Sequence, residues 1–315
     1  MIPPKVSILI VNYKVPALLE KCLSSIRHRT SCTYEVIVLD NNSDDGSVEM
    51  IQQKFPWVRL MVSTTNSGFA RGNNVALELA KGDYVFYLNP DTELTSDSIT
   101  YLAGFLDNHE NVGMVAPKLL NSDGSLQRSV RNFYSFKETL LDNRLFPFLK
   151  HNRWFQTSGL PSFWDHNQSR DIDWARGAAL MVRRSILDKL GAFDERFWVY
   201  GEEIDLCYRI KNAGWAIRFL PDVEIVHHQN QSARQNSTAM FIQNYRSHYL
   251  LLKKHYSILD RWLYQVRAMC AITVWIAWFG LKTVQNSDDD APARELVKYK
   301  KLLAWHFRRD EVVAA

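Results

Sequence analysis

The first half of the chain alternates short apolar runs with segments in which apolar residues recur every three or four positions. Residues 5–11 and 35–39 are β-branched runs of the kind that form buried parallel strands. Between them, the apolar residues of 18–26 follow helical spacing. The same reading predicts a weaker strand at 58–62, a helix at 74–80 and a strand at 84–88. Strands that alternate with helices predict an α/β fold, a doubly wound and mostly parallel sheet flanked by helices.

Polar clusters follow two of the predicted strands. Residues 40–45 come directly after one strand, and residues 89–91 after another. In open α/β sheets, ligands bind outside the carboxyl ends of the strands. Both clusters are also ordinary turn sequences, so their position alone does not distinguish a ligand-binding loop from a simple turn. A single carboxylate such as Asp91 can hold a hard divalent cation, which takes oxygen ligands and keeps waters or phosphates around it.

Two further groups of titratable residues lie downstream. Glu202, Glu203 and Asp205 are clustered where a helix is expected to begin. Acids in a first helical turn can simply complement the helix dipole, but clustered carboxyls also raise one another's pKa, which suits a general base. His227 and His228 end an apolar run, where a histidine can be a metal ligand or a surface residue.

The pattern changes beyond the first half. Residues 128–170 carry many aromatics and little periodicity, which indicates a variable loop or subdomain. Residues 268–281 are apolar with two tryptophans and basic flanks, but about 14 residues fall short of the roughly 20 that cross a bilayer. Such a segment suits a helix in a membrane interface, or one packed on protein. Residues 294–309 form a basic amphipathic tail.

The composition of the chain limits the classes of protein to which it can belong. The 315 residues are 46% hydrophobic and carry a net charge of only +4, so we expect a globular protein with no nucleic-acid partner. The four cysteines form no CxxC pair and are too sparse for a disulfide framework. The first apolar run is too short for a signal peptide. The expected location is the cytoplasm, with peripheral contact to the inner face of the cytoplasmic membrane left open.

Eight short stretches occur in a fixed order between residues 5 and 232, over about seven-tenths of the chain. In this order the chain resembles the glycosyltransferase family two enzymes with a GT-A fold, especially the bacterial rhamnosyltransferase-like branch. The stretches are Val6 to Tyr13, Val38 to Ser47, Asn66 to Asn74, Leu88 to Asp91, Arg176 to Ala178, Phe193 to Glu195, Gly201 to Arg209, and His227 five residues before Ser232.

The resemblance implies roles for individual residues. Asp91 matches the last acid of the family's DxD motif and is expected to bind Mg or Mn together with His227. Glu203 holds the position of the catalytic base, supported by Glu202 and Asp205. The donor is expected to contact Asn12, Tyr13, Asp40, Asn42, Asn66, Gly68, Arg71, Asn74 and Asn89, and the acceptor Trp174, Arg176, Gly177 and Tyr200.

Two positions depart from the family pattern. The DxD motif begins with the neutral Asn89, which leaves more of the cation's charge to Asp91, His227 and the phosphates. The base position holds Glu203 where aspartate is commoner, so the choice between Glu202 and Glu203 stays open. A QxxR sequence at 231–234 lacks the tryptophan of processive synthases, so few sugars are expected per encounter.

These expectations combine into one functional prediction. The chain is predicted to be an inverting, metal-dependent glycosyltransferase that moves a sugar, L-rhamnose from dTDP-rhamnose in the first instance, from a nucleotide-diphosphate donor to a hydroxyl of a cell-surface glycan or lipid-linked acceptor. A UDP-sugar donor and a non-catalytic carbohydrate-binding subunit are the alternatives. A sugar nucleotidyltransferase or a dehydrogenase is disfavoured because no glycine-rich phosphate loop follows the first strand.

The predicted organisation has two parts. Residues 1–235 are expected to form the GT-A catalytic domain, with a nucleotide-binding half at 1–125 and an acceptor-side half at 126–235. Residues 236–315 are expected to form a helical extension that contacts a membrane or joins two copies in a homo-oligomer. Within the catalytic domain, Asp91 and Glu203 are expected to face each other across a cleft.

Overall fold

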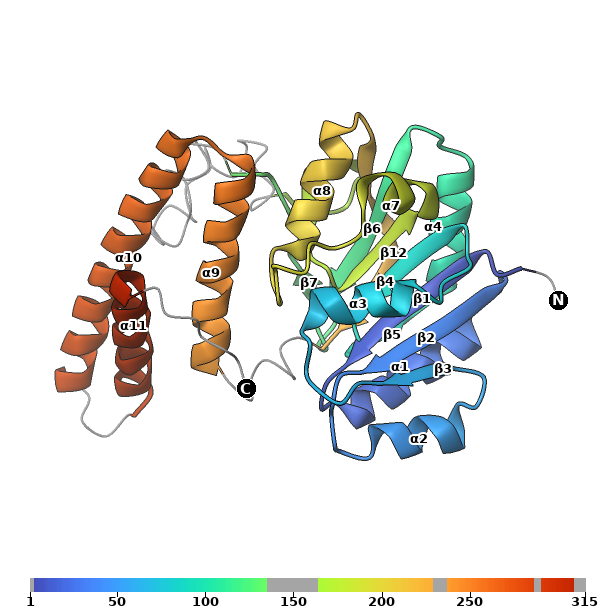
Figure 1. Cartoon of the computed structure of the whole chain (residues 1–315), viewed down its shortest axis with the longest axis horizontal. Helices are drawn as coiled ribbons and strands as arrows, with labels where there is room; N and C mark the ends of the chain where they lie inside the picture. The colour runs from blue at the N-terminus through green and yellow to red at the C-terminus, as the bar shows by residue number, and fades with distance from the viewer. Residues whose placement is uncertain (1–2, 135–163, 229–236, 286–289, 309–315) are drawn as a thin grey trace. The chain divides into compact units, whose positions relative to one another are not determined.

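A computed structural model describes residues 3–134, 164–228, 237–285 and 290–308 (Figure 1). The chain divides into two units, each considered by itself: the first comprises Met1–Phe133 and Arg153–Ser232, and the second Tyr134–Asn152 and Ala233–Ala315. The aromatic residues Trp154 and Phe155 of the predicted variable loop lie outside the described residues.

A mixed sheet forms the centre of the first unit, with the strand order β3-β2-β1-β4-β11-β6-β12-β5. The first four strands of that order pair in parallel, whereas β11 is antiparallel to both of its neighbours. The main strands are β1 Val6–Asn12, β2 Tyr34–Asp40, β3 Arg59–Val62, β4 Tyr84–Leu88, β5 Thr92–Leu94, β6 Val112–Leu120, β11 Ala179–Arg183 and β12 Ala216–His227. Short pairings are added by β7 Leu126–Gln127, β8 Val130–Arg131, β9 Arg170–Asp171 and β10 Trp174–Ala175.

Helices cover both faces of this sheet. The helices are α1 Pro16–Arg29, α2 Ser47–Lys54, α3 Phe69–Leu77, α4 Ser98–Asp107, α7 Arg184–Leu190 and α8 Glu202–Asn212. Side chains of α1, α2 and α4 pack in one core with Ile8 and Ile10 of β1, and those of α3, α7 and α8 pack in a second core with Leu9. Because successive strand residues point to opposite faces, both faces of β1 are buried, and the strand reads as a continuous apolar run. The predicted α/β architecture is confirmed.

The structure corrects one helix boundary. The helix expected at 74–80 is α3, which begins at Phe69 and ends at Leu77. Gly68 precedes it with φ +85°, a conformation that favours glycine, and Ala70 and Ala76 are buried in the core. Apolar spacing alone missed the first turn because its small residues carry little hydrophobic signal.

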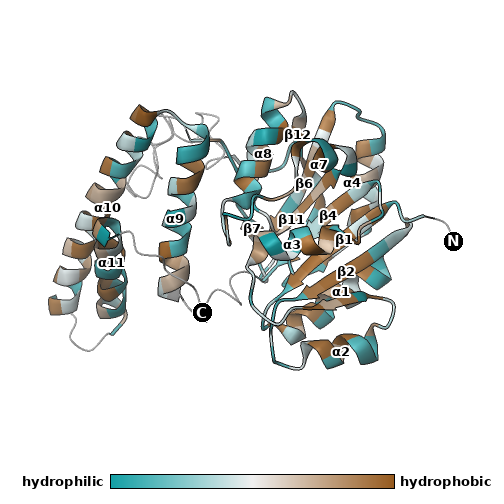
Figure 2. Ribbon diagram, viewed as in Figure 1, coloured by the Kyte–Doolittle hydropathy of each residue, from teal (hydrophilic) through white to brown (hydrophobic). Residues whose placement is uncertain are grey.

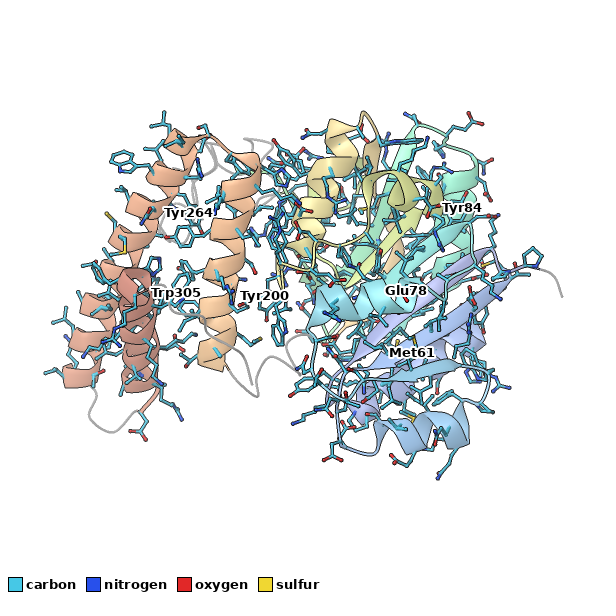
Figure 3. All side chains as sticks on the ribbon, in the orientation of Figure 1. Met61, Glu78, Tyr84, Tyr200, Tyr264 and Trp305 are labelled. Carbon is cyan, nitrogen blue, oxygen red and sulfur yellow. The ribbon has the colours of Figure 1, made fainter. Side chains whose placement is uncertain are left out.

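Three helices form the described part of the second unit: α9 Ser237–His255, α10 Ile258–Gln285 and α11 Asp290–Arg308. Ile242, Ile272 and Leu302 form their common core, one from each helix. Tyr264 of α10 packs edge-on against Tyr249 of α9, and Trp305 of α11 packs against the same ring in a tilted orientation; Figure 3 labels Tyr264 and Trp305.

The apolar segment predicted at 268–281 is shorter than the helix that contains it, α10. Helix α10 has 28 residues, because its scattered polar residues interrupt the apolar run without ending the helix. Within the described residues, α10 alone has the length and apolar composition to cross a membrane. Length and composition do not separate a spanning helix from one that lies on a surface.

Candidate active site

The carboxyl ends of β1 and β2 hold a buried polar cluster. Asn12 and Asp40 are at most 1% exposed. Asn12 Nδ2 donates to Asp40 Oδ2 at 2.8 Å and to Ser43 Oγ at 3.1 Å, and the Ser43 backbone N–H donates to Asp40 Oδ1 at 2.9 Å. Both carboxylate oxygens of Asp40 thus accept hydrogen bonds that fix the loop after β2.

Asn41 is a residue that the sequence reading did not single out. Its Oδ1 accepts the backbone N–H of Ser67 at 2.9 Å, and its Nδ2 donates to Asn66 Oδ1 at 2.9 Å and to the carbonyl of Gly68 at 3.1 Å. The side chain is 2% exposed. Asn41 therefore ties the loop after β2 to the loop before α3. The cluster of turn residues at 40–45 contained it, but nothing local distinguished it from its neighbours.

Gly68 makes a close approach to the loop that precedes α8. The Phe69 backbone N–H donates to the Trp198 carbonyl at 2.7 Å. A Cβ on Gly68 would lie 2.4 Å from that carbonyl oxygen, so only glycine fits. The N-terminus of α3 and the loop carrying Trp198 are thereby held in direct contact.

His227, at the end of β12, lies beside Asp91, which follows β4. His227 Nε2 is 3.2 Å from Asp91 Oδ1, and both side chains are nearly buried. On the other side of the ring, His227 Nδ1 is 2.7 Å from Gln127 Oε1. Asn89 Nδ2 makes a long contact of 3.4 Å with His227 Nε2. The structure thus brings together the two predicted metal ligands, with Gln127 as a neighbour that the sequence reading missed.

The hydrogen bonds of Gln127 show which of its side-chain atoms faces the His227 ring. Gln127 Nε2 can only donate, and it faces the backbone carbonyl oxygen of His227 and the side-chain Oδ1 of Asn121, each at 3.1 Å. Gln127 Oε1 therefore faces His227 Nδ1, which donates to it, so that in the neutral ring the Nε2 lone pair faces the Asp91 carboxylate. Two acceptors this close repel each other unless a proton or a cation lies between them.

This donor set fits a divalent cation. One imidazole nitrogen and one carboxylate oxygen suit Mn²⁺, and Mg²⁺ accepts the carboxylate with waters or phosphates. No group of three or more His, Cys, Asp or Glu side chains suited to a metal occurs among the described residues. Two protein ligands would leave the other coordination positions to the diphosphate and water.

The two acids that begin α8 have different surroundings. Glu202 is 3% exposed, and its Oε2 has no hydrogen-bond partner within the described parts of the chain. Burial raises the pKa of Glu202 well above its usual range, and the charge of Glu203 adds to the shift. Glu203 is half-buried, and its Oε2 accepts the Gly201 backbone N–H at 2.9 Å. Burial raises the pKa of Glu203 also, against the opposing effects of backbone N–H donors and Arg176.

A short backbone path joins Glu203 to the metal-ligand loop. A Cβ on Gly177 would lie 3.5 Å from Glu203 Cβ, so the two residues are neighbours. The next residue, Ala178, accepts the Asn89 backbone N–H at 2.9 Å, and Asn89 in turn contacts His227. Glu203 and Asp91 are thus linked through β11 and β4. Their approach across a cleft stays a prediction.

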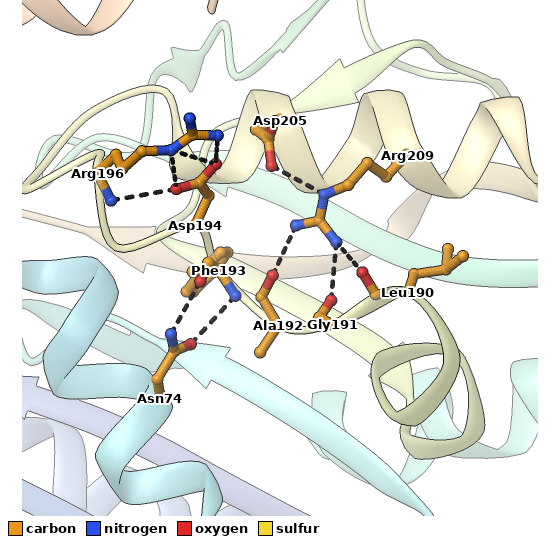
Figure 4. Close-up of polar contacts among 9 residues, drawn as sticks. All are labelled: Asn74, Leu190, Gly191, Ala192, Phe193, Asp194, Arg196, Asp205 and Arg209. Atoms are coloured by element: carbon orange, nitrogen blue, oxygen red, sulfur yellow. Dashed lines mark hydrogen bonds and ion pairs between the residues drawn. The ribbon is translucent and has the colours of Figure 1, made fainter. Parts of the chain in front are cut away.

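Asp205 and Arg209 hold the loop in front of α8 (Figure 4). Asp205 is fully buried, and its carboxylate accepts Arg209 Nε at 2.8 Å. The guanidinium also donates to the carbonyls of Leu190 and Gly191 at 2.8 Å and of Ala192 at 2.6 Å. Such a planar fork of donors suits several carbonyl oxygens at once. These contacts place Asp205 in support of the loop that leads to Glu203.

Asn74 fastens the same loop to α3. Asn74 Nδ2 donates to the Phe193 carbonyl at 2.8 Å, and the Phe193 backbone N–H donates to Asn74 Oδ1 at 3.1 Å (Figure 4). Asn74 thus contacts the backbone of Phe193, and its Nδ2 also donates to Glu195 Oε1 at 3.1 Å. Its predicted contact with the donor stays a prediction.

The remaining predicted residues are more accessible. Tyr13 is half-buried, and Asn42 and Arg71 are exposed. On the acceptor side, Trp174 is half-buried and its indole N–H donates to the Asn132 carbonyl at 2.8 Å. Tyr200, labelled in Figure 3, lies on the loop before α8 with φ +68°. Burial raises its pKa, and the charges of Glu202 and Glu203 add to the shift.

A separate open pocket lies at the opposite end of β4. It is lined by residues 80–84 and by Arg183, Arg184, Ser185 and Asp188. Tyr84 begins β4 and Arg183 ends the antiparallel β11, whereas Asn89 and Ala178 stand at the other ends of these strands. This pocket is therefore not the site that holds Asp91, His227 and Glu203.

Comparison with known proteins decides the family. The model of the family described as Glycosyl transferase family 2 matches residues 7–171. The chain belongs to glycosyl transferase family 2. The rhamnosyltransferase-like resemblance is confirmed by two relatives. The N-acetylglucosaminyl-diphospho-decaprenol L-rhamnosyltransferase of Mycobacterium tuberculosis is 29% identical over 258 residues, covering 78% of this chain and 83% of that protein. Rhamnosyltransferase WbbL of Escherichia coli is 24% identical over 251 residues, covering 77% and 89%.

A solved structure supports the GT-A fold of this family 2 glycosyltransferase. The mannosyltransferase PcManGT of Pyrobaculum calidifontis, in complex with GDP-Man and Mn²⁺, superposes with a TM-score of 0.57 at 16% identity, covering 97% of this chain and 86% of that chain. At this identity the likeness shows the fold. A glycosyltransferase of this family implies a nucleotide-sugar donor and a glycan acceptor.

Proposed function

We propose that the protein is an inverting, metal-dependent hexosyltransferase that transfers L-rhamnose from dTDP-rhamnose to a hydroxyl of a lipid-linked glycan. The choice of sugar and acceptor is supported by the names of two relatives that cover most of this chain. The observation that carries the chemistry is the Asp91–His227 pair and its short backbone path to Glu203.

The proposed reaction is a single displacement. Glu203 accepts the proton of the acceptor hydroxyl while that oxygen forms a bond to the anomeric carbon. The bond from the anomeric carbon to the diphosphate oxygen breaks at the same time, and the diphosphate leaves with the electron pair. A divalent cation held by Asp91 and His227 supplies positive charge to the diphosphate when it is bound. Attack from the face opposite the leaving group inverts the anomeric centre.

The contrast between the two acids favours Glu203 as the base. Glu203 is half-buried whereas Glu202 is 3% exposed, so Glu203 is the more accessible of the two. The raised pKa of Glu203 makes its ionised form a stronger base than an ordinary glutamate.

On the donor side, Arg71 is an exposed cation on the first turn of α3 and is proposed to contact the diphosphate. Asp40 and Tyr13 are proposed to line the base pocket.

The test is a transfer assay with the purified full chain. The acceptor is an N-acetylglucosaminyl-diphospho-lipid, the donors are dTDP-rhamnose and UDP-glucose, and each is offered with Mn²⁺ and with chelator. We expect transfer from dTDP-rhamnose, loss with chelator, and an anomeric configuration by proton NMR opposite to that of the donor. Transfer from UDP-glucose alone would change the donor assignment. Retained configuration would exclude the displacement, and tight dTDP binding without transfer to any acceptor would leave a binding subunit.

A further inference from the structure

Helix α10 carries an apolar stripe that the described part of the second unit leaves uncovered. Its members recur every four residues from Ile258 to Trp278, and Ile258, Trp262, Val274 and Trp278 are each more than half exposed. The exposed positions of α10 include no Asp, Glu, Lys or Arg; they are Ile258, Leu259, Trp262, Val266, Cys270, Thr273, Val274, Ala277, Trp278, Leu281, Val284 and Gln285. An exposed apolar surface of this extent marks an interaction site.

The other side of α10 already has partners. Ala268 and Ile272 are buried, and Ile272 packs with Ile242 of α9 and Leu302 of α11. Figure 2 shows apolar bands along α10, whereas α11 is more polar. The helix therefore has two apolar faces, of which one builds the core of the second unit and one is left for an external partner.

The charge of this unit is strongly basic. Described residues 237–285 and 290–308 contain eleven lysines and arginines and three acidic residues, although the whole chain carries only +4. Arg294, Lys300, Lys301 and Arg308 are exposed on α11. On α10, Lys282 Nζ lies 5.3 Å from the ring centroid of the exposed Trp278. A basic residue beside an interfacial tryptophan is typical of a helix whose apolar face enters the headgroup region.

We propose that the α10 stripe docks on the surface of an anionic lipid bilayer, with the helix lying in the plane of the interface. The partner is chosen by charge, since an anionic surface attracts basic residues whereas a second copy of this chain would bring two basic surfaces together. A spanning orientation is disfavoured because α11, with its lysines, packs along α10 and would have to enter the hydrocarbon. This docking does not depend on which sugar is transferred.

Vesicle co-sedimentation of the full chain tests the proposal. Vesicles of phosphatidylcholine alone are compared with vesicles that contain phosphatidylglycerol, at low and high salt. We expect binding to the anionic vesicles that weakens with salt, and a loss of roughly tenfold or more in the partition coefficient for the double variant Val274→Glu/Trp278→Glu. Both positions are exposed, so folding is expected to be retained. Tyr101→Glu is the matched control, because Tyr101 is 45% exposed on α4 outside the stripe.

Cys270, an exposed residue on the stripe, provides a second measurement. A bimane label on Cys270, in a Cys32→Ser background, should shift to the blue with anionic vesicles. The proposal is overturned if the wild-type protein binds to neither type of vesicle. It is also overturned if the bound protein resists alkaline carbonate extraction, as a protein with a spanning helix does. The third contrary result is a concentration-dependent dimer in which Cys270 cross-links two copies. Each of these results leaves the transferase assay unaffected, so the two proposals fail separately.

Discussion

Gln127 and His227 are joined by two hydrogen bonds, one from the imidazole Nδ1 to Gln127 Oε1 at 2.7 Å and one from Gln127 Nε2 to the His227 carbonyl at 3.1 Å. The pair fixes both the orientation and the tautomer of a proposed metal ligand. Such neighbours of metal ligands typically change metal affinity by about 10–100-fold when they are removed.

The first prediction follows from that pair. Gln127→Leu should raise the Mn²⁺ concentration for half-maximal transfer by about 10–100-fold. Gln127→Glu should lose less, because its carboxylate still accepts the Nδ1 proton. Asn121→Ala is the control, since it removes a partner of Gln127 but leaves the contact with His227 intact. An unchanged Mn²⁺ response in Gln127→Leu would remove Gln127 from this role.

The second prediction concerns the base. Glu203→Gln should lower kcat by about 10²–10⁴-fold while dTDP binding by calorimetry stays near the wild-type value. In wild-type protein, activity should rise with pH through a pKa above the usual 4.5 of a glutamate, because the ionised form is required. If Glu202→Gln abolishes turnover and Glu203→Gln does not, the base is Glu202.

The third prediction concerns the stability of the first unit. The folded pKa of Glu202 is raised above 4.5, so the folded state holds a proton that the unfolded state releases as pH rises. Stability from this carboxyl is fully present below about pH 4.5 and is lost as pH rises through the folded pKa. Glu202→Gln should therefore raise Tm at about pH 8 but not near pH 4.5, whereas Glu78→Gln, at an exposed position, should change Tm at neither pH.

The fourth prediction compares the cost of a Cβ at Gly68 with its cost at a second glycine of positive φ. Gly68→Ala and Gly124→Ala both place alanine at positive φ, +85° and +80°. A Cβ at Gly124 meets nothing within 4 Å, whereas one at Gly68 overlaps the Trp198 carbonyl. Gly124→Ala should cost about 1–2 kcal/mol in urea unfolding. Gly68→Ala should cost about 1–3 kcal/mol more, from the overlap and from a ψ of 176° that at this φ suits only glycine, and should raise KM for the donor. Equal costs at the two positions would show that α3 can move away from Trp198.

The sequence predicted those parts of the site that local signals mark. The polar loops after β2 and β4 follow apolar strands directly, so their position at the carboxyl ends of the sheet could be inferred from order alone. The start of α8 at Glu202 was close to the predicted helix start because acids cluster in its first turn. Gln127 could not be found this way, because its partner His227 lies 100 residues away and β7 has only two residues.

The position of β11 also has no local signal. Residues 179–183 form an ordinary apolar run, and nothing in it indicates an antiparallel strand between β4 and β6. Pairing of that kind is decided by the whole sheet rather than by the run itself. The same holds for Arg209, whose three carbonyl partners at 190–192 become contacts only when α8 packs against α7.

The insertion of β11 has a consequence for synthesis of the protein. Strand β4 is buried along its whole length and pairs with β1 on one side. Its other side pairs with residues 179–183, which are synthesised much later. A nascent chain that ends near residue 125 therefore presents an apolar strand with open hydrogen-bonding groups, a template for aggregation. We therefore expect that the two predicted halves of the catalytic domain are not separable as expressed fragments, and that the first needs protection until residues 179–183 have emerged from the ribosome.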